Sequence, residues 1–199
     1  MIPTYNKSNR RQNSGYPRLP KDVYVVRILS AKVAPTSKGF DQLNLAFDIA
    51  EGPYRDHYKA AYDRNRGEDK KWPADAVYRL TIPYPGCPEW VQINWDSFFA
   101  DLEDSNAGFV FNGDERALKG KLIGAKMRIE EWRSKTTGDI MQSTKMHWSC
   151  VADDVRQGRA GTLPKDKRIE KKEAGNGNGN NAALDEFLAV GGEDEIPFD

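Results

Sequence analysis

The chain has very few residues of the kinds that hold metals or form disulfides. Its 199 residues include two cysteines, Cys87 and Cys150, and two histidines, and neither pair has the spacing of a zinc site. No apolar run approaches the roughly 20 residues that span a bilayer, and residues 1–20 lack the apolar stretch of a secretory signal. We therefore expect a cytoplasmic protein with reduced, buried cysteines, no membrane partner, and no metal or other cofactor.

Catalytic motifs are also scarce. His57 and His147 belong to no metal-binding motif, and the chain has no phosphate-binding loop of the P-loop type. A metal-dependent enzyme would have to rely on a group of acidic residues, which are Asp96, Asp101, Glu103 and Asp104. A solvated acidic helix face explains the same residues, so we expect a protein that binds a partner and is not an enzyme.

Basic residues are absent from the last part of the chain. Residues 174–199 hold six acidic residues and no Lys or Arg, although the whole chain has no net charge. Residues 1–22 carry five basic residues and one acid, and residues 23–152 carry 18 of each. An acidic tail on a chain with basic regions can compete with a polyanion for the same surface.

Composition and periodicity divide the chain into four parts. Residues 1–20 are predicted to be a flexible basic arm and residues 21–155 a folded domain. Residues 156–190 are predicted to be a flexible linker, because the pattern fades there and the Asn- and Gly-rich stretch 176–181 has no means of burying a core. Residues 191–199 form a separate acidic tip.

Alternating apolar and polar residues predict that the folded domain is mainly β. The clearest alternation runs from Asp41 to Ile49, where the odd-numbered positions after Asp41 are apolar and the even-numbered positions are expected to face the other way. Turn residues at 134–139 predict a hairpin. Five strands are expected, at residues 23–33, 41–49, 76–84, 121–132 and 140–151.

Two further segments have helical spacing. Residues 88–102 place apolar side chains on one face, and tyrosines recur every four residues within 54–62. A five-stranded sheet with a helix between its third and fourth strands is the layout of the OB-fold, a small barrel that binds oligonucleotides. The expected class is therefore all-β, a five-stranded OB-fold barrel of order β-β-β-α-β-β, with an extra helix between strands 2 and 3 and disordered termini.

Three short motifs carry a resemblance that covers about residues 20–152. They are the Ser37-Lys38-Gly39 turn, the strand that ends at Glu51-Gly52, and Leu118-Lys119-Gly120-Lys121 before the fourth strand. Together they resemble an OB-type family of phages and mobile elements, whose members are largely uncharacterised or bind single-stranded DNA. The resemblance implies a role in DNA replication, recombination or repair in the cytoplasm of a bacterial host.

The end of the chain carries an independent resemblance. Acidic residues followed by Ile-Pro-Phe resemble the tip of bacterial and phage single-stranded DNA-binding proteins, in which Phe is usually last, whereas here Asp199 follows. The resemblance implies that the tip recruits replication or recombination proteins, with acids for a basic surface and apolar side chains for a notch. The expected contacts are Glu193, Asp194, Glu195, Ile196, Pro197 and Phe198.

Single-stranded DNA offers base faces that stack on aromatic rings and a backbone that Lys and Arg follow. In an OB-fold, the usual binding surface lies around the second and third strands, between two loops that are here residues 35–40 and 133–139. Cations and aromatic rings are also interleaved at 54–72. The candidate DNA-binding residues are Lys38, Phe40, Arg64, Arg66, Lys70, Lys71, Trp72, Arg79, Lys126, Arg128, Trp132, Arg133, Lys135 and Lys145.

The aromatic residues have different interpretations. The tyrosines within 54–62 either stack on bases or pack their helix against the barrel. Trp132 shares the polar side of its strand with two basic residues, which favours a stacking role. Trp148 shares the apolar side of the fifth strand and is expected in the core, as are Trp90 and Trp95 of the predicted helix.

The expected function is binding of single-stranded DNA without sequence preference, during phage DNA replication or recombination, with the tip recruiting partner enzymes. The alternative is an OB-fold protein–protein adaptor of the replication machinery that does not itself bind nucleic acid. The balanced charge of residues 23–152 favours this alternative. The oligomeric state stays open, and a homo-oligomer is one option.

Overall fold

Five strands and three helices make up most of the part of the chain described by the computed structural model, which is residues 17–67 and 69–169. The strands are β1 (Val23–Pro35), β2 (Asp41–Ile49), β3 (Val77–Thr81), β4 (Leu122–Arg133) and β5 (Ile140–Cys150). The helices are α1 (His57–Arg64), α2 (Glu89–Asp104) and α3 (Ala152–Arg156), with 3-10 turns η2 (Ala74–Ala76) and η3 (Glu115–Leu118). The expectation of a mainly β domain with few helices is confirmed.

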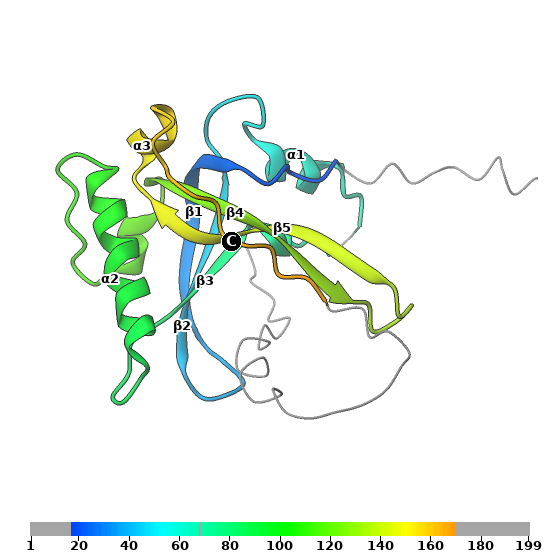
Figure 1. The fold of residues 1–199 in the computed structure, drawn as a ribbon, viewed down its shortest axis with the longest axis horizontal. Helices are drawn as coiled ribbons and strands as arrows, with labels where there is room; N and C mark the ends of the chain where they lie inside the picture. Colours follow the sequence, from blue (N-terminus) through cyan, green and yellow to red (C-terminus); the bar gives the residue numbers. More distant parts are fainter. Residues whose placement is uncertain (1–16, 68, 170–199) are drawn as a thin grey trace, which may run out of the picture.

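All strand pairs in the single five-stranded sheet are antiparallel, in the order β3-β2-β1-β4-β5. β1 is the central strand and pairs with β2 on one side and β4 on the other. Its register with β2 shifts between Ile28 and Ser30, and a bulge of this kind bends a strand. The sheet curves so that its edge strands β3 and β5 also contact each other (Figure 1).

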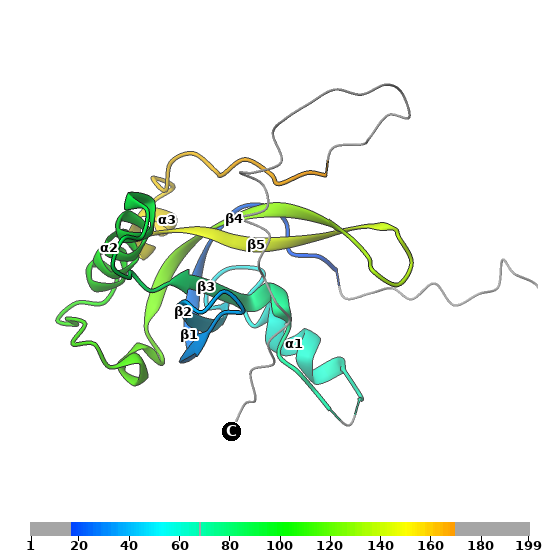
Figure 2. The same ribbon diagram turned by 90° about the horizontal axis from the view of Figure 1, so that it is seen from below.

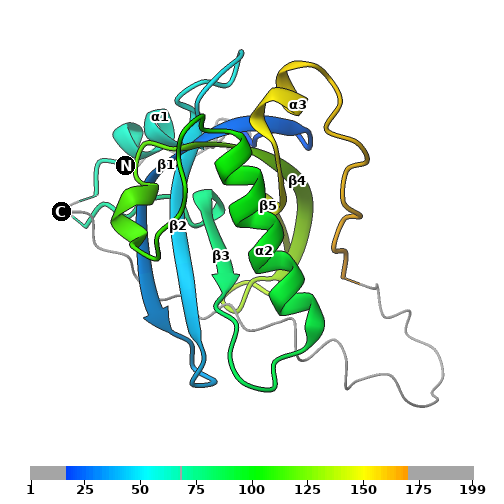
Figure 3. The ribbon, with the colours of Figure 1, turned by 90° about the vertical axis from the view of Figure 1, so that its left-hand side faces the viewer.

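The main core lies between the inner face of this curved sheet and α2. Phe47 of β2, Met127 of β4, and Phe98 and Leu102 of α2 are all fully buried in one cluster. Tyr78 of β3 stacks on Phe98, with ring centroids 5.8 Å apart. Figure 3 shows α2 lying across one end of the curved sheet, which is where its apolar face meets β3, β4 and β5.

β2 is buried on both sides, because α1 covers its outer face. Asp48 points outward, yet its carboxylate accepts hydrogen bonds from the backbone N–H groups of Ile49, Tyr58 and Lys59 at 2.8 to 2.9 Å. Two of these N–H groups belong to the first turn of α1, whose own N-cap, Asp56, makes no side-chain cap. A residue of the sheet therefore satisfies the helix terminus and fixes α1 in place.

The tyrosine spacing is explained in part by this packing. Tyr58 is only 4% exposed and meets Phe47 edge to face, at 5.8 Å between ring centroids. Tyr54 and Tyr62 are half-buried. At Tyr58, packing of the helix against the sheet is therefore the correct interpretation.

A bulge in β5 reverses which way its residues face. The register pairs Lys126 with Trp148 and Met127 with Met146, so that His147 is an extra residue on β5. One extra residue interrupts the period of two. Met146 faces the core, whereas Trp148 lies on the outer side with 45% of its surface exposed. The prediction that Trp148 is a core residue is therefore wrong.

The two tryptophans of α2 also differ from each other. Trp95 packs partly against the core, with its ring 4.8 Å from that of Phe99, as expected. Trp90 is 44% exposed, so the prediction that it lies in the core is wrong. The buried face of α2 contains Val91, and successive helix residues are rotated by about 100°. This rotation places Trp90 beside the buried face.

The hairpin of residues 126–148, here called the β4–β5 arm, projects from the rest of the molecule (Figure 2). Residues on both ends of the described chain lie along it. The Leu19 carbonyl accepts a hydrogen bond from the Thr144 hydroxyl at 2.6 Å. At the backbone edge of β4, Lys167 donates its N–H to the carbonyl of Ile129, and its carbonyl accepts from the N–H of Glu131, both at 2.9 Å.

The ordered contacts thus extend past residue 155 into the segment predicted to be a linker. Ala160 and Pro164 are buried, and Asp166 forms an ion pair with Lys21 at 2.7 Å. Residue Lys167 bridges to Glu130 in parallel. The pairing of 166–167 with β4 depends on partners distant in sequence, so the local composition of this segment does not indicate it.

Candidate nucleic-acid interface

In each of the two loops expected to flank the site, a backbone hydrogen bond joins residues of the same loop. Gly39 donates its N–H to Thr36, and Gly138 donates its N–H to Ser134, at 2.9 Å in both loops. Both glycines have φ between 75° and 81°, a conformation that suits glycine. Because both N–H groups already donate within their own loops, neither is available to a phosphate in this conformation.

The loops also point in different directions. The β1–β2 hairpin and the β4–β5 arm diverge in both views of the fold (Figures 1 and 2). At the first loop, Lys38 is exposed, while the Phe40 ring is half-buried and stacks on Tyr84 with centroids 4.3 Å apart. Arg79 of β3 is half-buried opposite Asn44 of β2.

A second group of candidates follows α1. The cations here are all exposed, and they are Arg64, Arg66, Lys70 and Lys71. The ring of Trp72 packs against the core on one side and lies 5.7 Å from Tyr62 on the other. Lys70 Nζ lies 5.7 Å from the centre of the Tyr62 ring.

A pocket of about 330 Å³ opens beneath this group, between α1 and the outer face of β1 and β2. Tyr62 and Trp72 supply aromatic walls, but three carboxylates, Asp48, Asp56 and Asp63, also line it. Its two cations are Arg27 and Lys59, and Lys59 is paired with Asp63 at 2.6 Å. Acidic lining of this kind is unfavourable for a phosphate backbone.

The third group forms a continuous row on the outer face of the β4–β5 arm. Trp132 is 42% exposed, and Lys145 Nζ lies 5.7 Å from the centre of its ring. Lys145 is 3.8 Å from the carboxylate of Glu130, which also pairs with Arg128 at 2.5 Å. We call this the outer row, and its members in order are Trp132, Lys145, Glu130, Arg128, His147 and Trp148.

The inner half of the outer row continues the same chain of contacts. Arg128 lies 3.2 Å from Nε2 of His147, whose ring centroid is 4.9 Å from that of Trp148. A guanidinium can only donate, so Nε2 of His147 is the acceptor and the proton of the neutral ring is on Nδ1. Burial first, and the charge of Arg128 second, lower the pKa of His147 to about 4. The ring is therefore neutral at pH 7.

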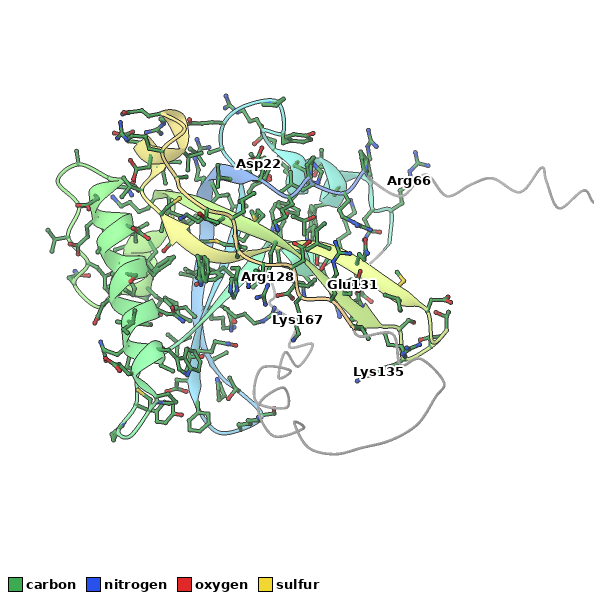
Figure 4. The ribbon with its side chains drawn as sticks, viewed as in Figure 1. Asp22, Arg66, Arg128, Glu131, Lys135 and Lys167 are labelled. Carbon is green, nitrogen blue, oxygen red and sulfur yellow. The ribbon has the colours of Figure 1, made fainter. Side chains whose placement is uncertain are left out.

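Glu130, in the middle of the outer row, is ionised at neutral pH. Burial acts to raise the pKa of this carboxyl, but the hydrogen bond from Arg128 and the charges of Arg128, Lys145 and Lys167 outweigh it, so its pKa is lowered. The carboxylate partly neutralises two of the candidate DNA-binding cations. Figure 4 shows Arg128 and Lys167 on the lower side of the arm, with Lys135 near its turn.

The structure thus brings together only part of the predicted set. Lys126, Arg128 and Trp132 alternate on one face of β4, and Lys145 joins them from β5. Arg133 and Lys135 are exposed at the turn, where the Arg133 guanidinium donates to the carbonyl of Gly138 at 2.9 Å. The candidates in loop 35–40, on β3 and at 64–72 lie on other elements. Residues Glu193 to Phe198 of the tip are outside the described residues.

Two residues of the same face were missed by sequence reasoning. Trp148 was assigned to the core, because no sequence signal marks the bulge at His147. Lys167 was placed in a linker, although it pairs with β4 beside Glu130. Its position depends on pairing with the β4 edge, about 37 residues away in the chain, which local composition does not indicate.

Two of the acidic residues of α2 form hydrogen bonds to other parts of the fold. Asp101 accepts a hydrogen bond from the Ser149 hydroxyl at 2.5 Å, and Glu103 accepts one from the N–H of Phe111 at 2.8 Å. Within residues 17–67 and 69–169, no group of three or more His, Cys, Asp or Glu side chains is placed to hold a metal. Cys87 and Cys150 are not joined in a disulfide.

In comparisons with known proteins, no protein-family model and no curated protein matches this chain. None of the helices in the described ranges has the length and apolar character needed to cross a membrane.

Proposed function

We propose that this protein binds single-stranded DNA without sequence preference, through an OB-type barrel, in DNA replication or recombination. Two features of the fold support an OB-type barrel: a five-stranded antiparallel sheet whose edge strands approach each other, and a helix across one end. A barrel of this type commonly carries single-stranded nucleic acid on its outer surface, with aromatic rings and cations side by side.

The observation that carries the proposal is the surroundings of Trp132. Its ring is exposed on the polar face of the β4–β5 arm, with the Lys145 ammonium at 5.7 Å from the ring centre. An exposed indole costs free energy in water and offers a flat face to a base, while the adjacent cation suits a phosphate.

The test is a titration of the full chain with labelled oligo-dT and with duplex DNA at two salt concentrations. We expect binding to the single strand to weaken with salt, with a logarithmic slope of about 0.7 per phosphate contacted. Trp132→Leu should weaken binding by about 1–3 kcal/mol, and the control Trp90→Leu, an equally exposed tryptophan on α2, should not. Salt-insensitive binding, or tighter binding to the duplex, would contradict the proposal.

The acidic tip extends the proposal to protein partners. Glu193 to Phe198 supply acids and apolar side chains suited to a basic, notched surface on replication or recombination proteins. A chain ending at Gly192 should bind single-stranded DNA equally well or more tightly, because a competing anion has been removed. Weaker DNA binding by this shortened chain would contradict the role of the tip as a partner hook.

A protein–protein adaptor without DNA binding is the second candidate function. It is favoured by the balanced charge of residues 23–152 and by the carboxylate of Glu130 between Arg128 and Lys145. Changing Trp132 and Lys135 together to Ala separates the two functions. An adaptor would have no DNA affinity to lose and would keep its partner, whereas a DNA-binding protein would lose DNA and keep a partner that docks on the tip.

A further inference from the structure

We infer that Trp148 is a second base-stacking site, so that single-stranded DNA lies lengthwise along the outer row, between Trp132 and Trp148. This inference rests on the proposed function and names the path of the ligand. It differs from the surface expected around β2 and β3, because the outer row lies on β4 and β5.

The exposure of Trp148 is set by the backbone of β5. The bulge at His147 turns Trp148 to the outer face, opposite Lys126, and leaves 45% of its surface exposed. Without the bulge, a strict alternation would have placed Trp148 on the same side as the buried Met146. Bulges are over-represented next to functional sites, where they redirect a side chain, as this bulge redirects the Trp148 ring to solvent.

The two exposed rings are joined by an unbroken line of contacts. Lys145 Nζ lies 5.7 Å from the centre of the Trp132 ring and 3.8 Å from a Glu130 oxygen, and Glu130 pairs with Arg128 at 2.5 Å. Arg128 lies 3.2 Å from Nε2 of His147, whose ring centroid is 4.9 Å from that of Trp148. Trp148 is paired with Lys126, which lies six residues from Trp132 along β4. At about 3.3 Å per residue, the rings are separated by about 20 Å along the strand.

Cations flank this path over its whole length. Lys145 and Arg128 belong to the outer row, and Lys126 lies opposite Trp148. Lys167 adds a further cation beside Glu130, because residues 166–167 pair with the edge of β4. Three carboxylates lie beside these four cations: Glu130 within the outer row, Asp75 near Lys145, and Asp101 near Lys126. The cations outnumber the carboxylates by one, which leaves a small positive balance to complement a phosphate backbone.

The experiment measures binding of the full chain to labelled oligo-dT of about 16 nucleotides, the upper site size of one OB-fold. The variants are Trp148→Leu, Trp148→Phe, Trp132→Leu and the control Trp90→Leu, with thermal unfolding measured for each. We expect Trp148→Leu to bind about fivefold more weakly or worse. Trp148→Phe should stay close to the unsubstituted chain, since Phe keeps an aromatic face, and Trp90→Leu should be unchanged.

Each other outcome has a defined meaning. If Trp132→Leu weakens binding and Trp148→Leu does not, the inference is overturned and the proposed function stands. Equal losses in Trp148→Leu and Trp148→Phe, with unchanged thermal unfolding, would also overturn a stacking role. If the unsubstituted chain binds no single-stranded DNA, the proposed function itself fails.

Discussion

β2 and the β4–β5 arm belong to one sheet, but their surroundings are opposite. Every residue from Leu43 to Ala50 is buried, since α2 and the sheet cover one face of β2 and α1 covers the other. Along the arm, Trp132, Ile140, Met141 and Trp148 are each at least 40% exposed. A strand covered on both faces serves the fold, whereas an arm with exposed apolar side chains has surface available to a ligand.

A carboxylate in each of the two regions shows the same difference. Asp48 of β2 is satisfied by three backbone N–H groups, two of which begin α1. Glu130 of the arm is satisfied by the side-chain cations Arg128 and Lys145. Backbone partners cannot leave without unfolding α1, but side-chain cations can turn toward a phosphate. The first carboxylate therefore stabilises structure, and the second restrains charges that suit a ligand.

The largest expected effect is on the buried strand. Phe47→Ala should lower the free energy of unfolding by about 3–5 kcal/mol, because it removes a fully buried ring and leaves a cavity. The control Met141→Ala, on the exposed arm, should change it by less than about 0.5 kcal/mol. Urea denaturation measures both. Similar losses in the two variants would remove the distinction between scaffold and arm.

A smaller loss is expected at the carboxylate that begins α1. Asp48→Ala should cost about 1–3 kcal/mol, since it leaves the N–H groups of Tyr58 and Lys59 without a buried acceptor. Asp48→Asn keeps one acceptor oxygen and should cost less. Asp63→Ala removes an exposed acid of α1 and serves as the control. If Asp48→Ala is as stable as Asp63→Ala in urea denaturation, the cap does not hold α1.

On the β4–β5 arm, removing a charge should change the affinity for single-stranded DNA. Glu130→Gln frees Arg128 and Lys145, so single-stranded DNA affinity should rise by about 1 kcal/mol, or about fivefold, with a steeper salt dependence. The control is Glu131→Gln, which changes the net charge by the same amount. Glu131 follows Glu130 on β4, so its side chain faces the other way and contacts Gln142. An equal effect of the two variants would mean that only net charge matters.

The smallest effect is a pH dependence at His147. Folding lowers the pKa of His147 to about 4, whereas the pKa in the unfolded chain is about 6.5. Between these two pH values the unfolded chain binds a proton at His147 and the folded protein does not. The stability contributed by neutral His147 is thus complete above about pH 6.5 and is lost as pH falls toward 4. The stability difference between the unsubstituted chain and His147→Gln should shrink over this range, measured by denaturation at several pH values. If this difference in unfolding free energy did not change with pH, the His147 ring would be solvated in the folded protein and not buried.

Local patterns in the sequence were sufficient to locate the five strands and the helices α1 and α2. The alternation at 41–49 coincides with β2, and the apolar spacing at 88–102 falls within one turn of the bounds of α2. These patterns reflect burial of one face, which repeats every two or 3.6 residues and can be read without knowledge of the partner. The exposed position of Trp132 on the polar side of β4 followed from the same rule.

The arrangement of the binding surface was decided only by tertiary structure. The bulge at His147 reversed the side of Trp148, and pairing of 166–167 with β4 placed Lys167 beside Glu130. Burial of Asp48 required α1 to fold over β2. Each depends on residues far apart in the chain that compete for the same hydrogen-bonding groups, and periodicity within one segment carries no information about such competition. Sequence alone therefore located the five strands, α1 and α2, but not the short helix α3, while long-range pairing determined which rings and charges share a face.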